Sequence, residues 1–276
     1  MKPLVSVIIP TYKREKELYK AVQTVIDQNY SGEIEIVVVD DSPKSIKEKI
    51  EKKFKKNKQN RTIKYIYHGQ PKGSPYARNL GVLKAKGEMI AFLDDDDTWM
   101  LEKIEKQVNL MEKFSDCPLV ICYSHDLRFG QNRINKPPDE ISHDMILKSF
   151  NLSSTSSYLV RADLLKNEYK KTGEIFDTQL PSAQEYDLAI RLSNHGKARC
   201  VPEILIEQNA CKGQISENWT RKIRGIAALY RKYHKEYKIA DHIKTVGLLG
   251  LFYLGFVFGN KIYQLIIPIK ELYENT

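Results

Sequence analysis

Apolar runs alternate with amphipathic segments along the N-terminal part of this chain. Two runs rich in β-branched residues, at 5–10 and 34–39, enclose a segment that carries Leu18, Val22 and Val25 at helical spacing. Apolar side chains that recur every three or four residues indicate a helix with one buried face. Continuous apolar strands that alternate with such helices are typical of parallel sheets covered on both faces. The pattern therefore predicts a repeating β-α-β unit of the kind that binds nucleotides.

The same alternation continues as far as residue 93, and the pattern then becomes less regular. Gly87 follows a helical segment and is the kind of residue that closes a helix. In the second half, single strands and helices without a regular repeat suggest a mixed sheet. The expected elements after residue 40 are a lysine-rich helix, strands at 63–67, 89–93 and 119–123, and helices at 74–86 and 185–194.

These elements predict an α/β protein with a mostly parallel central sheet and flanking helices. We expect the main domain at 1–216, with a nucleotide-binding half up to about residue 115 and a less regular half from 116. Residues 217–276 are expected to form a helical appendage, which is basic at first and then apolar. With 276 residues, of which 42% are hydrophobic, the chain can bury one sizeable core.

The charge distribution narrows the choice of partners. The formal net charge is +9, and lysines are concentrated between residues 44 and 64. They alternate with Ile46, Ile50 and Phe54 at helical spacing and lack the stacking aromatic residues of single-strand binders. We therefore expect no nucleic-acid partner. A solvated helix face, or contact with phosphates at a membrane surface, is left open for these lysines.

The cysteines and the two terminal segments indicate in which cellular compartment the chain is expected. The four cysteines form no C-x-x-C pair, and no signal-peptide pattern precedes Val5, so neither a zinc site nor a disulfide framework is predicted. We expect a cytoplasmic chain with peripheral contact at the inner face of the plasma membrane. The uncharged stretch 245–260 would span about 24 Å as a helix, less than the ~30 Å hydrocarbon core. Its own domain, a second copy of the chain in a homodimer, or a membrane surface must cover it.

Four consecutive carboxylates, Asp94 to Asp97, follow the expected strand at 89–93. Like charges in one turn repel each other unless water or a cation compensates them. Ligands of open α/β sheets bind beyond the carboxyl ends of the strands, so the run is a candidate edge of an active site. Three interpretations are open. They are a solvated turn in which Asp97 caps the next helix, the aspartyl-phosphate motif of haloacid-dehalogenase-like phosphatases, and an Asp-x-Asp clamp for a metal and a nucleotide diphosphate.

Several short motifs occur in a characteristic order along the chain. They are Val7-Ile8-Ile9-Pro10-Thr11-Tyr12, Val38-Val39-Asp40-Asp41-Ser42, Gly73-Ser74-Pro75-Tyr76-Ala77-Arg78-Asn79-Leu80-Gly81, Phe92-Leu93-Asp94-Asp95-Asp96-Asp97 and Gln184-Glu185-Tyr186-Asp187-Leu188. With these motifs the chain resembles the family 2 glycosyltransferases of GT-A fold over about residues 4–216.

The resemblance implies an inverting, metal-dependent glycosyltransferase. The donor would be a nucleotide-diphosphate-sugar, with a UDP-sugar as the first choice. The acceptor would be a hydroxyl of a glycan, a lipid-linked sugar or a protein, in the synthesis of cell-surface polysaccharide, glycolipid or glycoprotein. The base, the sugar, the acceptor and the linkage are not specified by these motifs.

The resemblance also implies roles for residues at the strand ends. Pro10, Thr11 and Tyr12 would line the nucleoside pocket. Asp40 would accept a hydrogen bond from the base, and Arg78 would approach the nucleotide from the next loop. The chemistry agrees, because an acceptor-only carboxylate suits a base N–H and a guanidinium suits a phosphate or a stacked ring.

The metal motif of the family falls on Asp94 and Asp96, with Asp96 as the first choice for direct contact. Asp95 occupies the variable position between them and is grouped with the nucleotide-binding residues. Hard carboxylate oxygens suit Mn²⁺ or Mg²⁺, either of which would neutralise the departing diphosphate. The phosphatase motif normally follows the first strand, whereas this run follows the fourth, which weakens that alternative.

Glu185 falls at the position of the family's catalytic base, and Asp187 is the second choice. Inversion at the anomeric carbon needs one base that takes the proton of the attacking hydroxyl. Two departures motivate an alternative, a nucleotide-sugar-binding scaffold with impaired catalysis. Glu185 stands where aspartate is more common, and Cys211 stands where many relatives carry a histidine, so that Lys212 would supply charge to the diphosphate instead.

Overall fold

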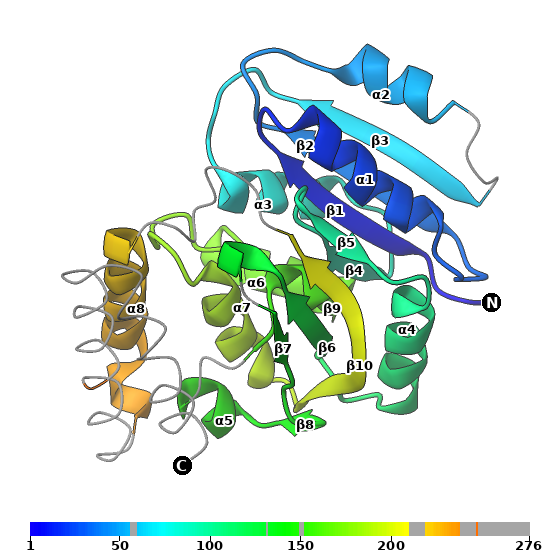
Figure 1. Ribbon diagram of the computed structural model, residues 1–276. Helices are drawn as coiled ribbons and strands as arrows, with labels where there is room; N and C mark the ends of the chain where they lie inside the picture. The colour runs from blue at the N-terminus through cyan, green and yellow to red at the C-terminus, as the bar shows by residue number, and fades with distance from the viewer. Residues whose placement is uncertain (56–59, 131, 149–151, 210–218, 238–246, 248–276) are drawn as a thin grey trace.

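One mixed sheet with helices on both faces forms the centre of the molecule (Figure 1). The computed structural model describes residues 1–55, 60–130, 132–148, 152–209, 219–237 and 247. Strands from before and after residue 115 are hydrogen-bonded into the same sheet. The two predicted halves of the main domain therefore share one continuous sheet.

The nucleotide-binding half supplies parallel strands. β1 (Val5–Thr11) lies between β2 (Ile34–Asp40) and β4 (Met89–Phe92), and β3 (Arg61–Tyr67) forms the edge. Every residue of β1, β2 and β4 is buried, because helices cover both faces of the sheet. Since the strands are parallel, their carboxyl ends meet at one edge, where the candidate site lies.

The second half of the sheet contains antiparallel pairs, as the loss of a regular repeat suggested. The strand order is β3-β2-β1-β4-β9-β6-β10-β5, in which β9 runs antiparallel to both β4 and β6, and β10 runs parallel to β6. The strands of this half are β5 (Asp97–Trp99), β6 (Leu119–Asp126), β7 (Arg133–Asn135), β8 (Glu140–Ile141), β9 (Leu159–Arg161) and β10 (Ala198–Gln208).

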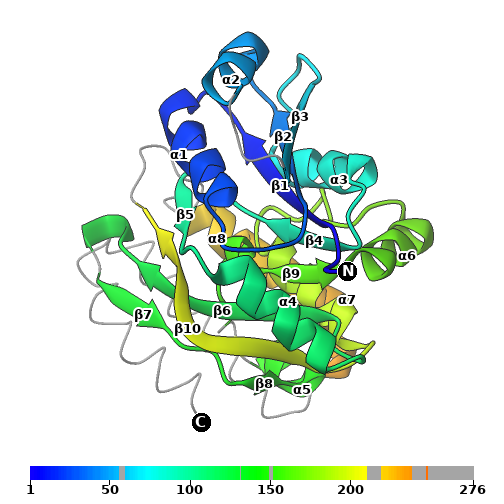
Figure 2. The ribbon, with the colours of Figure 1, turned by 90° about the vertical axis from the view of Figure 1, so that its right-hand side faces the viewer.

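Two hydrophobic clusters, one on each face of the sheet, hold the helices in place. One face packs against α1 (Glu15–Ile26), α2 (Lys47–Lys53) and α4 (Lys103–Lys113), and Figure 2 shows α4 against β6 and β10. The other face packs against α3 (Ser74–Lys84), α6 (Ala162–Thr172) and α7 (Gln184–Ser193). The other helices among the described residues are α5 (His143–Lys148), α8 (Trp219–Tyr233) and 3₁₀ turns at Arg128–Gly130, Thr155–Ser157 and His234–Glu236.

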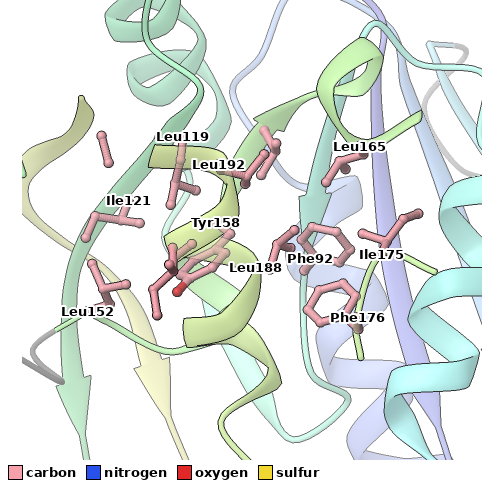
Figure 3. Close-up of a cluster of buried hydrophobic side chains, with 14 of the residues drawn as sticks. Phe92, Leu119, Ile121, Leu152, Tyr158, Leu165, Ile175, Phe176, Leu188 and Leu192 are labelled. Carbon is pink, nitrogen blue, oxygen red and sulfur yellow. The ribbon is translucent and has the colours of Figure 1, made fainter. Parts of the chain in front are cut away.

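Aromatic packing joins the strands to the helical layer near the site (Figure 3). The rings of Phe92, at the end of β4, and Phe176 meet edge to face with centroids 5.1 Å apart. Leu188 and Leu192 from α7 are buried in the same cluster. Such contacts fix α7 relative to the strand ends, and so they fix the side chains at its first turn.

Helix α8 packs on the main domain, although the sequence predicted it as the start of an appendage. Leu229 and Tyr233 of α8 are buried in the same cluster as α7. Gly225 lies against the loop before α7, and a Cβ added there would come within 2.0 Å of Ser182 Oγ. Only glycine therefore allows this close approach of α8.

The interpretation of Asp97 as a helix cap, one of the three left open, is wrong. Asp97 begins β5, where it pairs with Gln208 of β10, and α4 begins six residues later at Lys103. Glu102 occupies the N-cap position and makes no side-chain capping bond. The reason is a long-range strand pairing, which no local capping pattern reveals.

Part of the C-terminal prediction lies outside the described residues. In the described part of the chain, no helix is long and apolar enough to cross a membrane. The apolar stretch at 245–260, apart from residue 247, lies outside it, and so do Cys211 and Lys212. The expected cover of this stretch, the homodimer, the peripheral membrane contact and the domain boundary at 216 stay predictions.

Candidate active site

A cavity of about 880 Å³ opens at the carboxyl ends of β1, β2 and β4 and extends to the start of α7 and α8. It collects residues from distant parts of the chain, as expected for an open α/β sheet. Residues of the predicted site that line it are Pro10, Thr11, Tyr12, Arg78, Asp94, Asp95, Asp96 and Glu185. Further charged lining residues are Lys13, Arg14, Asp41, Asp97, Arg128, Arg221 and Lys222.

Two arginines hold the acidic run in place. Arg78, from α3, donates through Nη2 to Asp94 Oδ1 at 2.5 Å. Arg14, which precedes α1, donates through Nη1 to Asp95 Oδ1 at 3.0 Å and to Asp96 Oδ2 at 2.7 Å. Charge-assisted hydrogen bonds of this kind fix both partners in geometry. The run is thus a positioned cluster and not the freely solvated turn of the first interpretation.

The other contacts of the run are made by hydroxyl groups. Thr11 Oγ1 donates to Asp95 Oδ2 at 2.8 Å, and Ser156 Oγ donates to Asp97 Oδ2 at 2.6 Å. Burial raises the pKa of Asp95 to about 6, and the charge of Asp96 adds to this rise, whereas Arg14 opposes it. Burial also raises the pKa of Asp97, and the charges of Asp94 and Asp96 act in the same direction. The cluster carries more negative charge than its protein surroundings compensate, and a bound cation would relieve this repulsion.

The donor atoms fit a divalent metal that shares its ligands with a substrate. Among the residues that the structure describes, no three His, Cys, Asp or Glu side chains converge as a complete metal site. Mg²⁺ and Mn²⁺ are commonly held by one or two carboxylates together with phosphate oxygens and water. Asp94 and Asp96 both line the cavity and supply oxygens of this kind.

The structure brings Asp41, rather than Asp40, to the cavity. Asp40 is fully buried, and its carboxylate accepts hydrogen bonds from the Tyr65 hydroxyl and from the Ser42 amide at 2.9 Å. Asp41 lines the cavity. The expected contact of Asp40 with a nucleotide base has no support from this geometry, because Asp40 is the last residue of the β2 ladder and does not line the cavity.

Asp41 also positions the loop before α3. Its Oδ1 accepts the Lys72 amide at 2.8 Å, and its Oδ2 accepts the Gly73 amide at 2.7 Å. Gly73 has φ +89°, a conformation that favours glycine and leads the chain into α3. Tyr12, 44% exposed, borders the same cavity. These groups form a compact pocket beside the acidic run.

Glu185 lies in the first turn of α7 and lines the cavity with Arg78 and the acidic run. Ala183, which precedes the helix, has φ +63°, a left-handed conformation that is uncommon outside glycine. Burial raises the pKa of Glu185, and the Asp94 charge acts in the same direction, whereas the charges of Arg78 and Arg128 lower it. A carboxylate with a raised pKa is a better proton acceptor than one in open water.

Asp187, the second choice for the base, lies away from the cavity lining. Its side chain is fully buried, and Oδ2 accepts a hydrogen bond from Arg191 Nε at 3.0 Å. Oδ1 accepts from the Tyr233 hydroxyl at 2.8 Å and lies 2.6 Å from Lys232 Nζ. Tyr233 and Lys232 both belong to α8. Asp187 therefore joins α7 to α8, and Glu185 is the carboxylate of this helix that reaches the cavity.

Several cavity residues were missed by sequence reasoning. Arg14 and Arg128 lie outside the motifs that were used, and Arg128 reaches the cavity only because β6 ends there. Its guanidinium pairs with Asp126 through Nε at 2.8 Å and Nη2 at 2.7 Å. Arg221 and Lys222 belong to α8 and reach the cavity through the packing of that helix. No local pattern signals such contacts.

Comparison with known proteins relates this geometry to one family. Residues 6–168 match the family described as "Glycosyl transferase family 2". The chain is 28% identical over 240 residues to the putative teichuronic acid biosynthesis glycosyltransferase TuaG of Bacillus subtilis, which covers 85% of this chain and 90% of TuaG. It is 33% identical over 158 residues to the UDP-Glc:alpha-D-GlcNAc-diphosphoundecaprenol beta-1,3-glucosyltransferase WfaP of Escherichia coli, which covers 57% of this chain and 61% of WfaP.

Solved structures show the same fold. S. aureus TarS 1–349 in complex with UDP-GlcNAc aligns with a TM-score of 0.65 at 17% identity, over 95% of this chain and 74% of that one. The mannosyltransferase PcManGT from Pyrobaculum calidifontis, in complex with GDP-Man and Mn²⁺, aligns with a TM-score of 0.65 at 16% identity, over 84% of this chain and 65% of that one. At such identities the likeness concerns the fold alone.

Proposed function

The chain belongs to glycosyl transferase family 2 and has the GT-A fold, and on this premise we propose that it is a metal-dependent, inverting enzyme that moves a sugar from a nucleotide-diphosphate-sugar to an acceptor hydroxyl. The observation that carries the proposal is the meeting of the acidic run and Glu185 in one cavity. The match to this family argues against the phosphatase alternative.

The donor is proposed to bind at the ends of β1, β2 and β4. Pro10, Thr11 and Tyr12 contact the nucleoside, and Asp41 takes the role that was expected of Asp40, since a carboxylate accepts a base N–H. Arg78 lies beside the diphosphate. The structures with UDP-GlcNAc and GDP-Man indicate that proteins of this fold accept either base, so we propose UDP- and GDP-sugars as the donors to test first.

Asp41→Asn is expected to weaken the binding of the nucleoside diphosphate by roughly tenfold or more, because a carboxamide presents a donor to a base N–H and leaves one partner unsatisfied. Asp40→Asn should change this affinity only a few-fold, since Asp40 does not line the cavity. Calorimetric titration of UDP and GDP into both folded variants measures the difference. A larger loss in Asp40→Asn would return the base contact to Asp40.

Asp94 and Asp96 are proposed to hold Mn²⁺ or Mg²⁺, which supplies charge neutralisation to the diphosphate as it departs. Support comes from the place of both carboxylates in the cavity lining and from the raised pKa of the neighbouring Asp95. Asp95 itself contributes by bonding to Thr11 and Arg14, which keeps the run in place.

Asp96→Asn should abolish the Mn²⁺ dependence of nucleoside diphosphate binding, because it removes a charged metal ligand with little change of shape. Asp95→Asn is the matched control and should be milder, since its neighbours Thr11 and Arg14 still position the loop. The measurement is the affinity for UDP or GDP with Mn²⁺ and with EDTA. Equal Mn²⁺ dependence in wild type and both variants would contradict the assignment.

Glu185 is proposed as the base of the transfer. It takes the proton of the acceptor hydroxyl while the oxygen bonds to the anomeric carbon, and the bond from that carbon to the diphosphate breaks on the opposite face. The nucleoside diphosphate then leaves with both electrons of the broken bond. One base suffices for a single displacement, which agrees with the single carboxylate of α7 in the cavity lining.

Cell-surface polysaccharide or glycolipid synthesis is the proposed setting. Its support is the likeness to TuaG, named for teichuronic acid biosynthesis, and to WfaP, named for transfer to a diphosphoundecaprenol-linked sugar. The scaffold alternative predicts donor binding with neither transfer nor slow metal-dependent release of free sugar. Incubation with UDP- and GDP-sugars and Mn²⁺, followed by detection of free sugar, separates the two.

A further inference from the structure

Two cations of α8 form part of the cavity wall near Glu185. Arg221 and Lys222 line the cavity together with Ile226 of the same helix. From this arrangement we propose that Arg221 and Lys222 bind an anionic group of the acceptor, a phosphate or a carboxylate close to the reacting hydroxyl. The inference rests on the proposed function and adds the substrate class of its acceptor.

Arg221 is held in position by contacts with the loop before α7. Arg221 Nε donates to the Pro181 carbonyl at 2.5 Å, and Ser182 Oγ donates to the Arg221 carbonyl at 3.1 Å. This loop leads directly into α7, whose first turn carries Glu185. At its other end, α8 is tied to α7 through Asp187. A binding group on a fixed helix keeps a constant distance from the base, as acceptor positioning requires.

The balance of charges in the cavity lining supports a role for these cations in binding an anionic acceptor. Without Arg221 and Lys222, carboxylates outnumber cations among the lining residues. An anionic acceptor that approached Glu185 would therefore meet like charge. Cations on α8 offset this repulsion, whereas a neutral acceptor would not need them.

Helix stability does not account for these residues. Both lie in the first turn of α8, which contains no acidic residue. The N-terminal turn of a helix carries partial positive charge, so cations there are unfavourable for the helix itself. A planar guanidinium can bind two oxygens of a phosphate or carboxylate, and a lysine adds a compact charge. Arg221 and Lys222 are therefore well suited to binding an oxyanion, whereas they do not stabilise α8 itself.

The test uses the full chain with the donor site filled. The protein is saturated with UDP or GDP, whichever binds, and Mn²⁺, and calorimetry then compares a sugar 1-phosphate with its methyl glycoside, and decyl phosphate with decyl glucoside. The variant is Arg221→Gln with Lys222→Gln. The control is Arg224→Gln, an exposed arginine of the same helix outside the cavity lining.

We expect wild type and Arg224→Gln to prefer the phosphate probes, and the double variant to lose roughly tenfold or more in affinity for them, as loss of charge-assisted bonds predicts. Affinity for UDP or GDP should stay the same in all three proteins. A loss confined to decyl phosphate assigns a lipid-linked acceptor, and an equal loss for sugar 1-phosphate assigns an anionic glycan.

The inference is overturned if nucleotide-bound wild type shows no preference for phosphate probes, or if the double variant retains it. Failure of the proposed function would give a different result, and the titration with UDP or GDP, which precedes the phosphate probes, would reveal it. A wild-type protein that binds neither UDP nor GDP contradicts the donor site, and the inference about the acceptor falls with it.

Discussion

Replacing Glu185 by glutamine should lower sugar transfer by roughly 10²- to 10⁴-fold, the usual contribution of a positioned base. Glutamine keeps the size and hydrogen-bonding capacity of the side chain but cannot take the acceptor proton. Affinity for the nucleoside diphosphate should barely change, because the donor contacts lie at the strand ends. The measurements are the transfer rate and the calorimetric affinity. Glu185→Asp is the control and should retain part of the activity, since it keeps a carboxylate.

The pH dependence gives a second readout of the same residue. Burial raises the pKa of Glu185 in the folded protein, and the base must be ionised to accept a proton. Activity should therefore fall as the pH drops through this raised pKa, at a higher pH than for an ordinary glutamate. Turnover of Glu185→Gln near the wild-type rate would assign the base to another cavity carboxylate, and Asp187 is no longer a choice because it is fully buried beside α8.

Asp187→Ala should lower the free energy of unfolding by roughly 3–5 kcal/mol, the cost of leaving the partners of a buried carboxylate unpaired. Its side chain is 0% exposed and pairs with Arg191 of α7 and Lys232 of α8. Loss of these contacts should also loosen α8 from α7. Urea denaturation of wild type and variant measures the effect.

Asp177→Ala is the matched control, because Asp177 pairs with the same Lys232 at 2.8 Å from a more exposed position. Such surface pairs contribute about 0–1 kcal/mol. If both variants lost the same stability, the buried Asp187 would not be the connection between the two helices. A normal fold for Asp187→Ala with unchanged transfer would show in addition that the cavity does not depend on this connection.

Local pattern determined much of the fold, for physical reasons that can be read from particular elements. The runs at 5–10, 34–39 and 89–93 contain at most one polar residue each, Ser6 and Glu35, so they had no polar face to expose and were expected to be buried between two helical layers. Carboxyl ends of parallel strands share one edge. The ends of β1 and β4 therefore had to bring Thr11 and the acidic run together, and the structure has a hydrogen bond between Thr11 and Asp95.

Contacts across long distances in the sequence decided the rest. Asp97 became part of a strand through pairing with Gln208, and Asp41 rather than Asp40 reached the cavity because Asp40 stayed in the β2 ladder. Arg221 entered the site only through the docking of α8 on the main domain. Adjacent carboxylates have the same local chemistry, and an amphipathic basic helix has many surfaces on which it could pack. The sequence by itself therefore identified the family, the strands β1 to β4 and β6, and the acidic run. Tertiary packing selected which carboxylates and cations line the cavity, because burial and charge pairing depend on neighbours that no local pattern specifies.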